Sequence, residues 1–241
     1  MLWWSLPVLF WVLMFFVFLG ITAVRGVPHT ARIDRIARSP YLPRILMEYG
    51  YWMIDAPANL MVRLRVTPNM ITTLSLLFTI GAAVLFGMGR MAEGGWALVF
   101  GFLCDAWDGI VARKTNTSSM AGEFYDATVD RYNDLFAFLG LMYYYRNDPL
   151  PLGLATLAMI GSTLTSYTRA KGESVGVDPN VGWMQRHERG VYLGLATAMA
   201  PVVGYFTVVA VLALMAVTAN VTAIWRARFV LTGLANRGAQ S

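Results

Sequence analysis

Two neighbouring segments decide how this chain is interpreted: Asp105-Ala-Trp-Asp108-Gly109-Ile-Val-Ala112-Arg113 and, after eight further residues, Gly122-Glu-Phe-Tyr-Asp126-Ala-Thr-Val-Asp130. Apolar runs long enough to cross a membrane flank both segments. A single carboxylate at the centre of a bilayer costs roughly 3 kcal/mol, and carboxylates that converge also repel one another. A divalent cation such as Mg²⁺ is the simplest partner that neutralises them, because hard cations take oxygen ligands.

The spacing of the four aspartates predicts that they converge. Side chains three or four residues apart share one helix face, so Asp105 lies beside Asp108, and Asp126 lies beside Asp130. The polar segment between the two pairs is short and predicts a loop joining two antiparallel helices, which brings both pairs to a similar depth. Asp134, one turn beyond Asp130, is expected to form a hydrogen bond with a neighbouring helix, with a role as a fifth metal ligand as the alternative.

The composition is that of a membrane protein. Of the 241 residues, 57% are hydrophobic and 14% are charged, and the mean hydropathy is +0.53. This length suits one domain of six or seven spans. The net charge of +5 is typical of cytoplasmic loops that face anionic lipid headgroups, so nucleic acid is not expected as a partner. The single cysteine, Cys104, is expected to be a small packing residue.

The region before the aspartates divides into two parts. Within residues 1–24, an uncharged apolar run predicts an uncleaved transmembrane helix with its N-terminus outside. A cleaved signal peptide is disfavoured because no basic residue precedes the run. Residues 25–66 mix arginines with aromatic residues and contain Pro28, Pro40, Pro43 and Pro57. They predict a cytoplasmic interfacial helix that the prolines break into short pieces.

Residues 67–230 predict six transmembrane helices, followed by a cytoplasmic tail at residues 231–241. The first helix begins at Thr67, a suitable N-cap, with Pro68 at the first helical position, and continues to Met88. Pro201 and Gly204 predict a tight turn between the fifth and sixth helices. The other expected boundaries are 94–113, 122–145 and 150–167 for the second to fourth helices, a start at 186–189 for the fifth, and an end at 226–228 for the sixth.

The predicted fold is therefore an all-α integral membrane protein: a six-helix transmembrane core, an extra N-terminal transmembrane helix and a cytoplasmic interfacial helix. Of the nineteen basic residues, only Arg90 and Arg146 fall in loops assigned to the outside, in agreement with the positive-inside rule. The same topology places the aspartates on the cytoplasmic side of a multi-pass protein of the cell membrane.

Basic residues at three helix ends form a second group: Arg169 and Lys171 end the fourth helix, Arg186 and Arg189 begin the fifth, and Arg226 and Arg228 end the sixth. Membrane anchoring explains any one of them, but all are predicted at the same face as the aspartates. Clustered Arg and Lys side chains bind phosphate through charge-assisted hydrogen bonds. The group therefore predicts a second, anionic substrate.

The two segments quoted above match the pattern D-x-x-D-G-x-x-A-R-x8-G-x3-D-x3-D without a departure. This pattern resembles the signature of the CDP-alcohol phosphotransferase family of integral-membrane enzymes, and the resemblance covers about residues 50–230. Such enzymes transfer a phosphatidyl or similar group from a CDP-linked donor to an alcohol and release CMP. The resemblance implies two Mg²⁺ ions, for which Mn²⁺ can substitute, and a homodimer.

The resemblance also implies roles for individual residues. Asp105, Asp108, Asp126 and Asp130 would bind metal, and Asp130 would also act as a general base toward the acceptor hydroxyl. The residues that would contact the CDP-linked donor are Thr67, Pro68, Asn69, Met70, Gly109, Ala112, Arg113, Ser119 and Gly122.

Within the family, the basic group resembles that of the phosphatidylinositol-phosphate synthase branch, with its motif S-Y-x-[KR]-x-[KR]. By that resemblance Arg169, Lys171, Arg189 and Arg226 would hold the phosphate of inositol phosphate, and CDP-diacylglycerol would be the donor. The order here, Arg169 before Lys171, departs from the usual Lys before Arg. Glycerol phosphate, inositol and serine stay open as acceptors.

Two other classes of protein remain alternatives. A membrane prenyltransferase also binds Mg-diphosphate through paired aspartates, but it would lack the G-x-x-A-R end of the first segment and the whole second segment. A cation transporter is expected to carry its carboxylates near the bilayer midplane, whereas these are predicted near one membrane face.

Overall fold

A computed structural model describes residues 6–26, 44–183 and 186–238. Within these ranges the chain forms eight helices and no strand, which confirms the predicted all-α class. The helices are α1 (Leu6–Arg25), α3 (Arg44–Arg63), α4 (Pro68–Gly87), α5 (Met91–Thr115), α6 (Met120–Tyr144), α7 (Pro149–Ser174), α8 (Arg186–Val203) and α9 (Phe206–Gly238).

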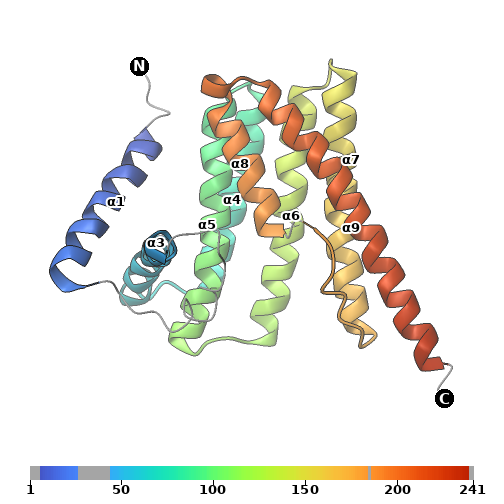
Figure 1. Ribbon diagram of the computed structural model, residues 1–241, viewed down its shortest axis with the longest axis horizontal. Coiled ribbons are helices and arrows are strands. Elements are labelled where there is room, and N and C mark those ends of the chain that lie inside the picture. The colour runs from blue at the N-terminus through green and yellow to red at the C-terminus, as the bar shows by residue number, and fades with distance from the viewer. Residues whose placement is uncertain (1–5, 27–43, 184–185, 239–241) are drawn as a thin grey trace.

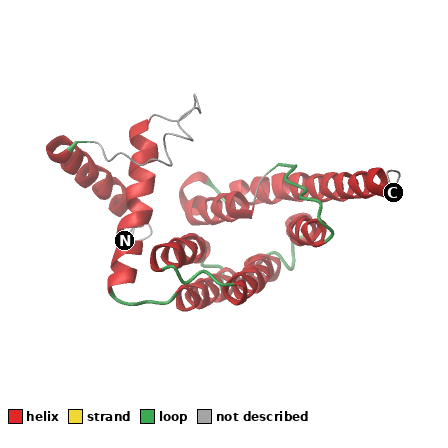
Figure 2. Cartoon of the chain, turned by 90° about the horizontal axis from the view of Figure 1, so that it is seen from below, coloured by secondary structure: helices red, strands yellow, loops and turns green. Residues whose placement is uncertain are grey.

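Helices α4 to α9 form one bundle, and α1 and α3 lie beside it (Figures 1 and 2). Helix α4 packs against both α5 and α6, α8 packs against α5 and α9, and α7 packs along α9. The segment after α7 turns back along α9, since the Trp183 backbone N–H donates to Thr222 Oγ1 at 3.1 Å. Helix α8 consequently begins partway along the bundle rather than at its end (Figure 1).

The bundle has the properties of a membrane protein. Four helices in the described ranges are long and apolar enough to cross a bilayer: α4, α5, α7 and α9. Their outer surfaces expose apolar side chains such as Leu77, Leu157 and Val217, whereas a surface helix in water exposes a polar face. The 20 residues of α4 correspond to about 30 Å, the thickness of a hydrocarbon core.

The other predicted spans are less apolar. Helices α6 and α8 run alongside these four but carry charged residues in their first turns, such as Glu123 and Glu188. The apolar part of α1, Leu13–Val24, is shorter, and the start of the predicted N-terminal span lies outside the described residues. The six-span core, the extra span and their orientation therefore remain predictions.

The start of the bundle and the turn near its end agree with the sequence. Thr67 has extended backbone angles and its Oγ1 accepts a hydrogen bond from the Met70 backbone N–H at 3.4 Å, with Pro68 as the first helical residue. Gly204, with φ of +111°, lies in the turn between α8 and α9. The start of α4 and the turn at Gly204 are confirmed. Pro201, however, does not lie in the turn: it is inside the last part of α8, where it removes one backbone hydrogen bond.

The prediction that Pro57 interrupts the juxtamembrane segment is wrong. Pro57 lies inside α3, where it removes one backbone hydrogen bond. Met53 and Ala58, on either side of it, are buried, and Ala58 belongs to a cluster with Ile71 of α4. We attribute the continuous helix to this burial. The other three prolines of the segment lie outside the described residues.

Two helices extend further than predicted. Helix α7 continues past Tyr167 to Ser174, and α9 continues past Arg228 to Gly238. No proline follows either predicted end within these helices, and the prediction equated the end of the apolar run with the end of the helix. Most of the predicted C-terminal tail is therefore helical.

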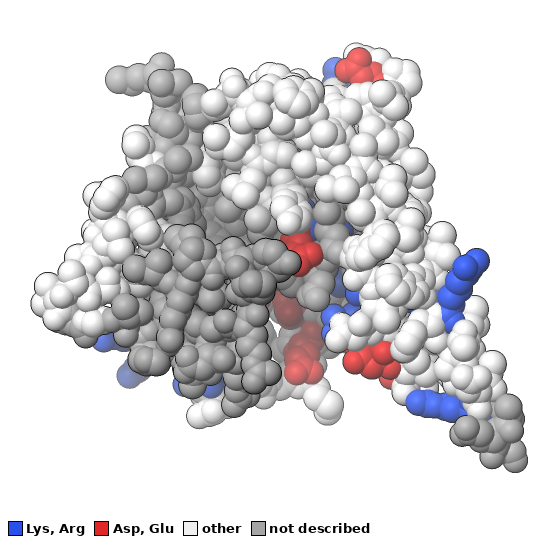
Figure 3. All heavy atoms as spheres, in the orientation of Figure 1, with Lys and Arg blue, Asp and Glu red and all other residues white. Residues whose placement is uncertain are grey.

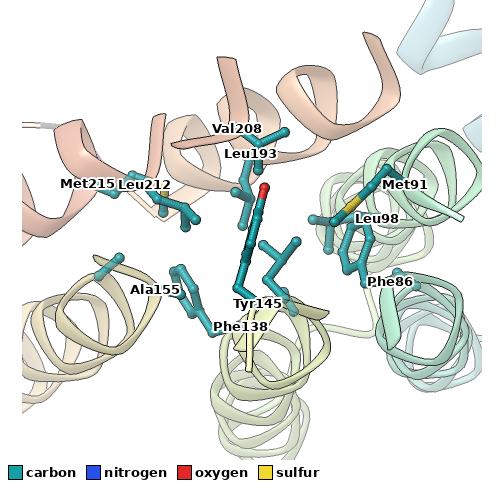
Figure 4. Packing of buried hydrophobic residues seen from close by; sticks show 14 of the residues in the cluster. Phe86, Met91, Leu98, Phe138, Tyr145, Ala155, Leu193, Val208, Leu212 and Met215 are labelled. Atoms are coloured by element: carbon teal, nitrogen blue, oxygen red, sulfur yellow. The ribbon is translucent and has the colours of Figure 1, made fainter. Parts of the chain in front are cut away.

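Apolar side chains fill the half of the bundle that contains the α4–α5 and α6–α7 connections. The main cluster draws on all six bundle helices, and its large members converge in Figure 4. They include Phe86, Met91, Leu98, Phe138, Leu141, Tyr145, Leu193, Val208, Leu212 and Met215. This core leaves the opposite half, where α5 ends and α6 begins, for polar residues.

Helix α3 is fixed to the end of α5 that carries the first aspartate pair. Trp107 Nε1 donates to the Ile54 carbonyl at 2.9 Å, and Lys114 Nζ lies 2.6 Å from Asp55 Oδ1. Cys104 is buried in the apolar cluster between them, which confirms its prediction as a packing residue. The juxtamembrane helix thus supports the helix on which the site is built.

Candidate functional site

A tight connection joins the two helices that carry the aspartates. Helix α5 ends at Thr115, and the next residue, Asn116, adopts the left-handed conformation with φ of 53° while the Thr117 N–H donates to the Ala112 carbonyl at 3.0 Å. This is a Schellman-type end, and asparagine tolerates it better than most residues. Ser119 then caps α6 by accepting from the Gly122 N–H at 3.1 Å. The predicted loop is confirmed, and both aspartate pairs lie near it.

Three of the four signature aspartates converge. Asp105, Asp126 and Asp130 each offer a carboxylate oxygen, and these oxygens lie within 4.8 Å of one another. Asp126 Oδ1 is buried and has no hydrogen-bond partner among the described residues. Closely spaced carboxylate oxygens with unsatisfied lone pairs are suited to a divalent cation, so these residues fit the metal that the family resemblance implies.

Asp108 is placed differently. It is buried, and its Oδ2 accepts a 2.6 Å hydrogen bond from Thr72 Oγ1 of α4. It does not belong to the group of three, but it lines the same cavity as Asp126. Thr72 was not predicted as a site residue, because one threonine in an apolar helix carries no distinguishing sequence signal.

A cation from α8 enters the carboxylate cluster. Arg186 Nη1 donates to Asp105 Oδ1 and Oδ2 at 3.1 and 3.3 Å, and its Nη2 lies 2.7 Å from Asp130 Oδ1. Its Nε lies 3.4 Å from Asp134 Oδ1, so Asp134 contacts a neighbouring helix as predicted, but through an ion pair rather than an aligned hydrogen bond. From the sequence alone, the role of Arg186 could not be distinguished from that of Arg189, three residues later.

A first cavity of about 440 Å³ opens between α4, α5 and the start of α6. All the predicted donor-contact residues line it except Met70, whose side chain is 59% exposed. The full lining is Thr67, Pro68, Asn69, Thr72, Asp108, Gly109, Ala112, Arg113, Thr117, Ser118, Ser119, Gly122, Glu123 and Asp126.

A second cavity of about 290 Å³ lies between α6, α7, α8 and α9. Of the predicted acceptor residues, Arg169, Arg189 and Arg226 line it, whereas Lys171 is exposed and outside the lining. Arg186, which belongs to the predicted basic group but was given no acceptor role, also lines this cavity, and Arg131 was not predicted there. The lining comprises Ala127, Asp130, Arg131, Thr165, Ser166, Arg169, Ala170, Glu173, Arg186, Arg189 and Arg226.

The guanidinium of Arg226 is held in a fixed position at this cavity. Its Nε donates to the Val181 carbonyl at 2.9 Å and its Nη1 to the Thr165 carbonyl at 3.0 Å. These partners are neutral, so the positive charge of Arg226 is not cancelled by them. Arg189 is likewise buried, with 3% of its surface exposed. Buried cations at a polar cavity favour an anionic ligand.

The carboxylate cluster lies at the boundary between the two cavities, because Asp126 lines the first and Asp130 lines the second. In Figure 3, acidic atoms form part of a hollow in the lower half of the molecule, with basic atoms beside them. Fold and site together define a helical membrane protein in which two polar cavities adjoin one carboxylate cluster.

Comparisons with known proteins identify the family. Residues 65–232 match the family described as CDP-alcohol phosphatidyltransferase, so this chain belongs to that family. A phosphatidylinositol phosphate synthase of Mycobacterium tuberculosis is 30% identical over 205 residues, covering 82% of this chain and 93% of that protein. An archaetidylinositol phosphate synthase of Pyrococcus horikoshii is 31% identical over 135 residues, covering 56% of this chain and 70% of that protein.

Solved structures agree with this assignment. The M. tuberculosis phosphatidylinositol phosphate synthase with CDP-DAG bound superposes with a TM-score of 0.68 at 26% identity, covering 74% of this chain and 94% of that chain. The same enzyme in complex with manganese and citrate also gives 0.68, at 27% identity, covering 74% and 89% of the two chains. The prediction of the family and of the branch it most resembles is confirmed.

Proposed function

We propose that this protein transfers the phosphatidyl group of CDP-diacylglycerol to inositol phosphate and releases CMP. The observation that carries this proposal is the arrangement of two cavities on either side of one carboxylate cluster, the second of them rich in arginine. The names of the relatives and the CDP-DAG bound to the solved neighbour support the same donor and acceptor.

The first cavity would bind the CDP part of the donor. Its small residues Gly109 and Gly122 leave room for a ligand close to the backbone. Arg113, whose guanidinium lies beside Gly109, would pair with a phosphate of the donor. Asp108, which accepts a hydrogen bond from Thr72, and Asp126 also line this cavity. Their negative charges would repel the diphosphate in the absence of bound cations.

Divalent cations would be held by Asp105, Asp126 and Asp130, together with Asp108, which lies one turn from Asp105. We propose two Mg²⁺ ions, for which Mn²⁺ can substitute. When bound, such cations supply the positive charge that neutralises the diphosphate and stabilises charge on the displaced oxygen. The solved neighbour in complex with manganese supports this assignment.

The second cavity would hold the acceptor by its phosphate. Arg169, Arg189 and Arg226 come from three helices, and their guanidinium groups can share the charge of a phosphate dianion through bidentate hydrogen bonds. Lys171 lies outside the lining, so we assign it the lesser role of attracting the anion to the entrance.

Asp130 would act as the general base of the transfer. It belongs to the carboxylate cluster and also lines the acceptor cavity, so it can accept the proton of an acceptor hydroxyl placed there. The acceptor oxygen then bonds to the β-phosphorus of the donor as the bond from that phosphorus to the CMP oxygen breaks. CMP leaves with the electron pair of that bond, and the proton remains on the Asp130 carboxylate.

We propose six spans for α4 to α9, an extra span for α1, and a location in the cell membrane with the site facing the cytoplasm and the N-terminus outside. The placement of all but two basic residues on one side supports this orientation. We also propose a homodimer, on family resemblance.

Product identification tests the acceptor. Purified protein is incubated with CDP-diacylglycerol, Mg²⁺ and one acceptor at a time, and lipid products are identified by mass, with EDTA as the metal-free control. We expect phosphatidylinositol phosphate from inositol phosphate, and little product from inositol, serine or glycerol phosphate. Equal turnover with inositol or serine would overturn the acceptor-phosphate assignment. Preferred turnover of glycerol phosphate would reassign the polyol.

A further inference from the structure

Arg186 occupies the position at which the carboxylate cluster needs a positive charge. Its guanidinium contacts Asp105 and Asp130, two of the three residues whose oxygens lie within 4.8 Å of one another. It also contacts Asp134, deeper on α6. Only 16% of the Arg186 side chain is exposed, so water does little to weaken these attractions.

These contacts depend more on charge than on hydrogen bonding. Arg186 Nη1 forms hydrogen bonds with both oxygens of Asp105. In contrast, Nη2 and Nε have no aligned hydrogen-bond partner in the described part of the chain, although Asp130 Oδ1 is 2.7 Å away. A partner held chiefly by charge can be replaced by another cation of higher charge that offers better coordination.

A divalent cation and Arg186 cannot both use the same carboxylate oxygens. If the cation binds Asp105 and Asp130, it repels the guanidinium from them. Asp134 is outside the converging group and can retain Arg186 after this displacement. Arg186 also lines the second cavity beside Arg189 and Asp130. Its displaced guanidinium would therefore stay next to the site assigned to the acceptor phosphate.

We propose that Arg186 is an exchangeable counter-cation. It neutralises Asp105 and Asp130 in the metal-free protein, yields them to the metal, and then pairs with the phosphate in the second cavity. The phosphate half of this proposal rests on the proposed function, and the metal half does not. Metal binding and acceptor binding are therefore coupled: the metal releases Arg186 from the carboxylates, and the acceptor phosphate binds the released guanidinium. Tight acceptor binding thus requires bound metal.

Titration with Mn²⁺ tests the metal half, using the purified full-length protein without CDP-lipid. Arg186→Gln should bind Mn²⁺ about ten- to a hundredfold more tightly than wild type, the factor expected when one competing charged hydrogen-bond partner is removed. Arg186→Lys should fall between the two, because it keeps the charge without the planar fork. Arg228→Gln, at an exposed position on α9 that lines neither cavity, is the matched control.

Thermal unfolding gives a second readout. Metal-free Arg186→Gln should unfold at a lower temperature than wild type, since its carboxylates repel without a counter-cation. Its stabilisation by Mn²⁺ should be larger, because stabilisation grows with affinity. If Arg186 merely orients Asp105 for the metal, Arg186→Gln will bind Mn²⁺ with equal or lower affinity, and this result would overturn the proposal. Arg186→Lys gives the same decision if the glutamine variant does not fold.

Binding of inorganic phosphate tests the second half. In wild type, saturating Mn²⁺ should tighten phosphate binding several-fold, and this gain should be lost in Arg186→Gln. An equal gain in both proteins would show that Arg186 takes no part in phosphate binding. Neither titration uses CDP-diacylglycerol or an inositol compound, so a failed acceptor assignment and a failed exchange mechanism give different patterns of results.

Discussion

The four signature aspartates differ in the partners that surround them. Asp105 and Asp130 share Arg186, Asp108 accepts from Thr72, and Asp126 has a buried oxygen without a hydrogen-bond partner among the described residues. A buried carboxylate oxygen without a partner is costly. Asp130 Oδ1 also has no hydrogen-bond partner among the described residues, but it has an ion pair with Arg186, so a bound cation would supply the partner that Asp126 Oδ1 needs.

Replacement of Asp126 by Asn should abolish transfer while leaving a folded protein. The amide has the same shape but no charge, so metal binding is lost. Repulsion within the cluster falls, and the metal-free variant should unfold at the same temperature as wild type or higher. Activity and thermal unfolding are compared with those of Asp148→Asn, an exposed aspartate at the start of α7. Near-normal turnover of the Asp126 variant would contradict the metal assignment.

The hydrogen bond from Thr72 orients Asp108, a proposed metal ligand, so its loss should weaken metal binding. Thr72→Val keeps the shape and removes the donor, so activity or metal affinity should fall by about ten- to a hundredfold. Thr79→Val is the control, because Thr79 is equally buried on α4 but donates to the Ser75 carbonyl of its own helix at 3.0 Å. Equal losses in both variants would indicate a general packing defect in α4.

At the scale of the helices, small residues decide how closely the site-bearing elements approach. Gly140 of α6 faces the backbone of Ala83 in α4, and an added Cβ would lie 2.6 Å from the Ala83 Cα. Such close contacts between membrane helices depend on glycine and other small residues. The position of the Asp126–Asp130 pair thus depends on a contact in the apolar half of the same helix.

Gly140→Ala should separate α4 from α6 and destabilise the fold. Overpacking typically costs about 1 to 3 kcal/mol, so the unfolding temperature should fall by several degrees. Gly153→Ala on α7 is the control, since nothing lies within 4 Å of its added Cβ, and alanine favours a helix over glycine by about 1 kcal/mol. If the two variants were equally stable, the α4–α6 contact would not be the close one described.

Sequence predicted the elements well where local chemistry determines them. Thr67 and Pro68 start α4, and Gly204 marks the turn before α9, because capping and left-handed backbone conformations restrict the residue type. Helix ends beyond the apolar runs were missed in α7 and α9. Pro57 was misassigned because tertiary burial, which the sequence does not display, offsets its helix-breaking tendency.

Some parts of the site, like some of the helices, could be predicted from the sequence, and others could not. The spacing within each helix predicts which aspartates share a face, but not which oxygens meet across helices. Three of the four converge, and Asp108 instead contacts Thr72. Arg186 and Lys171 are both basic residues at helix ends, yet Arg186 enters the cluster and Lys171 stays exposed. The two side chains differ in position because α8 begins inside the bundle, which is a property of the fold that the sequence does not display.

The whole molecule is polar in one half of the bundle and apolar in the other. The apolar core lies toward the connections at residues 88–90 and 145–148, and both cavities lie toward the α5–α6 loop. We propose that this polarity corresponds to the orientation of the protein in the membrane. The donor nucleotide, the metal and the acceptor phosphate would all enter from the same side.

Cysteine labelling tests that direction. In a Cys104→Ala background, Ser118→Cys and Asp148→Cys place one thiol at an exposed position at each end of the bundle. A membrane-impermeant maleimide applied to intact cells should label position 148 and spare position 118, and cell lysis should expose both. Labelling of position 118 in intact cells would place the site on the outside.

In the proposed enzyme, one carboxylate cluster serves a donor cavity on one side and an acceptor cavity on the other. Steady-state kinetics of Arg189→Ala and Arg113→Ala test this division, because these arginines line opposite cavities. Loss of a charged hydrogen bond costs roughly 1.5 to 3 kcal/mol. Arg189→Ala should therefore raise the KM for inositol phosphate about ten- to a hundredfold with little change for CDP-diacylglycerol, and Arg113→Ala should do the reverse. Equal effects of either variant on both KM values would contradict the division of the site into two substrate cavities.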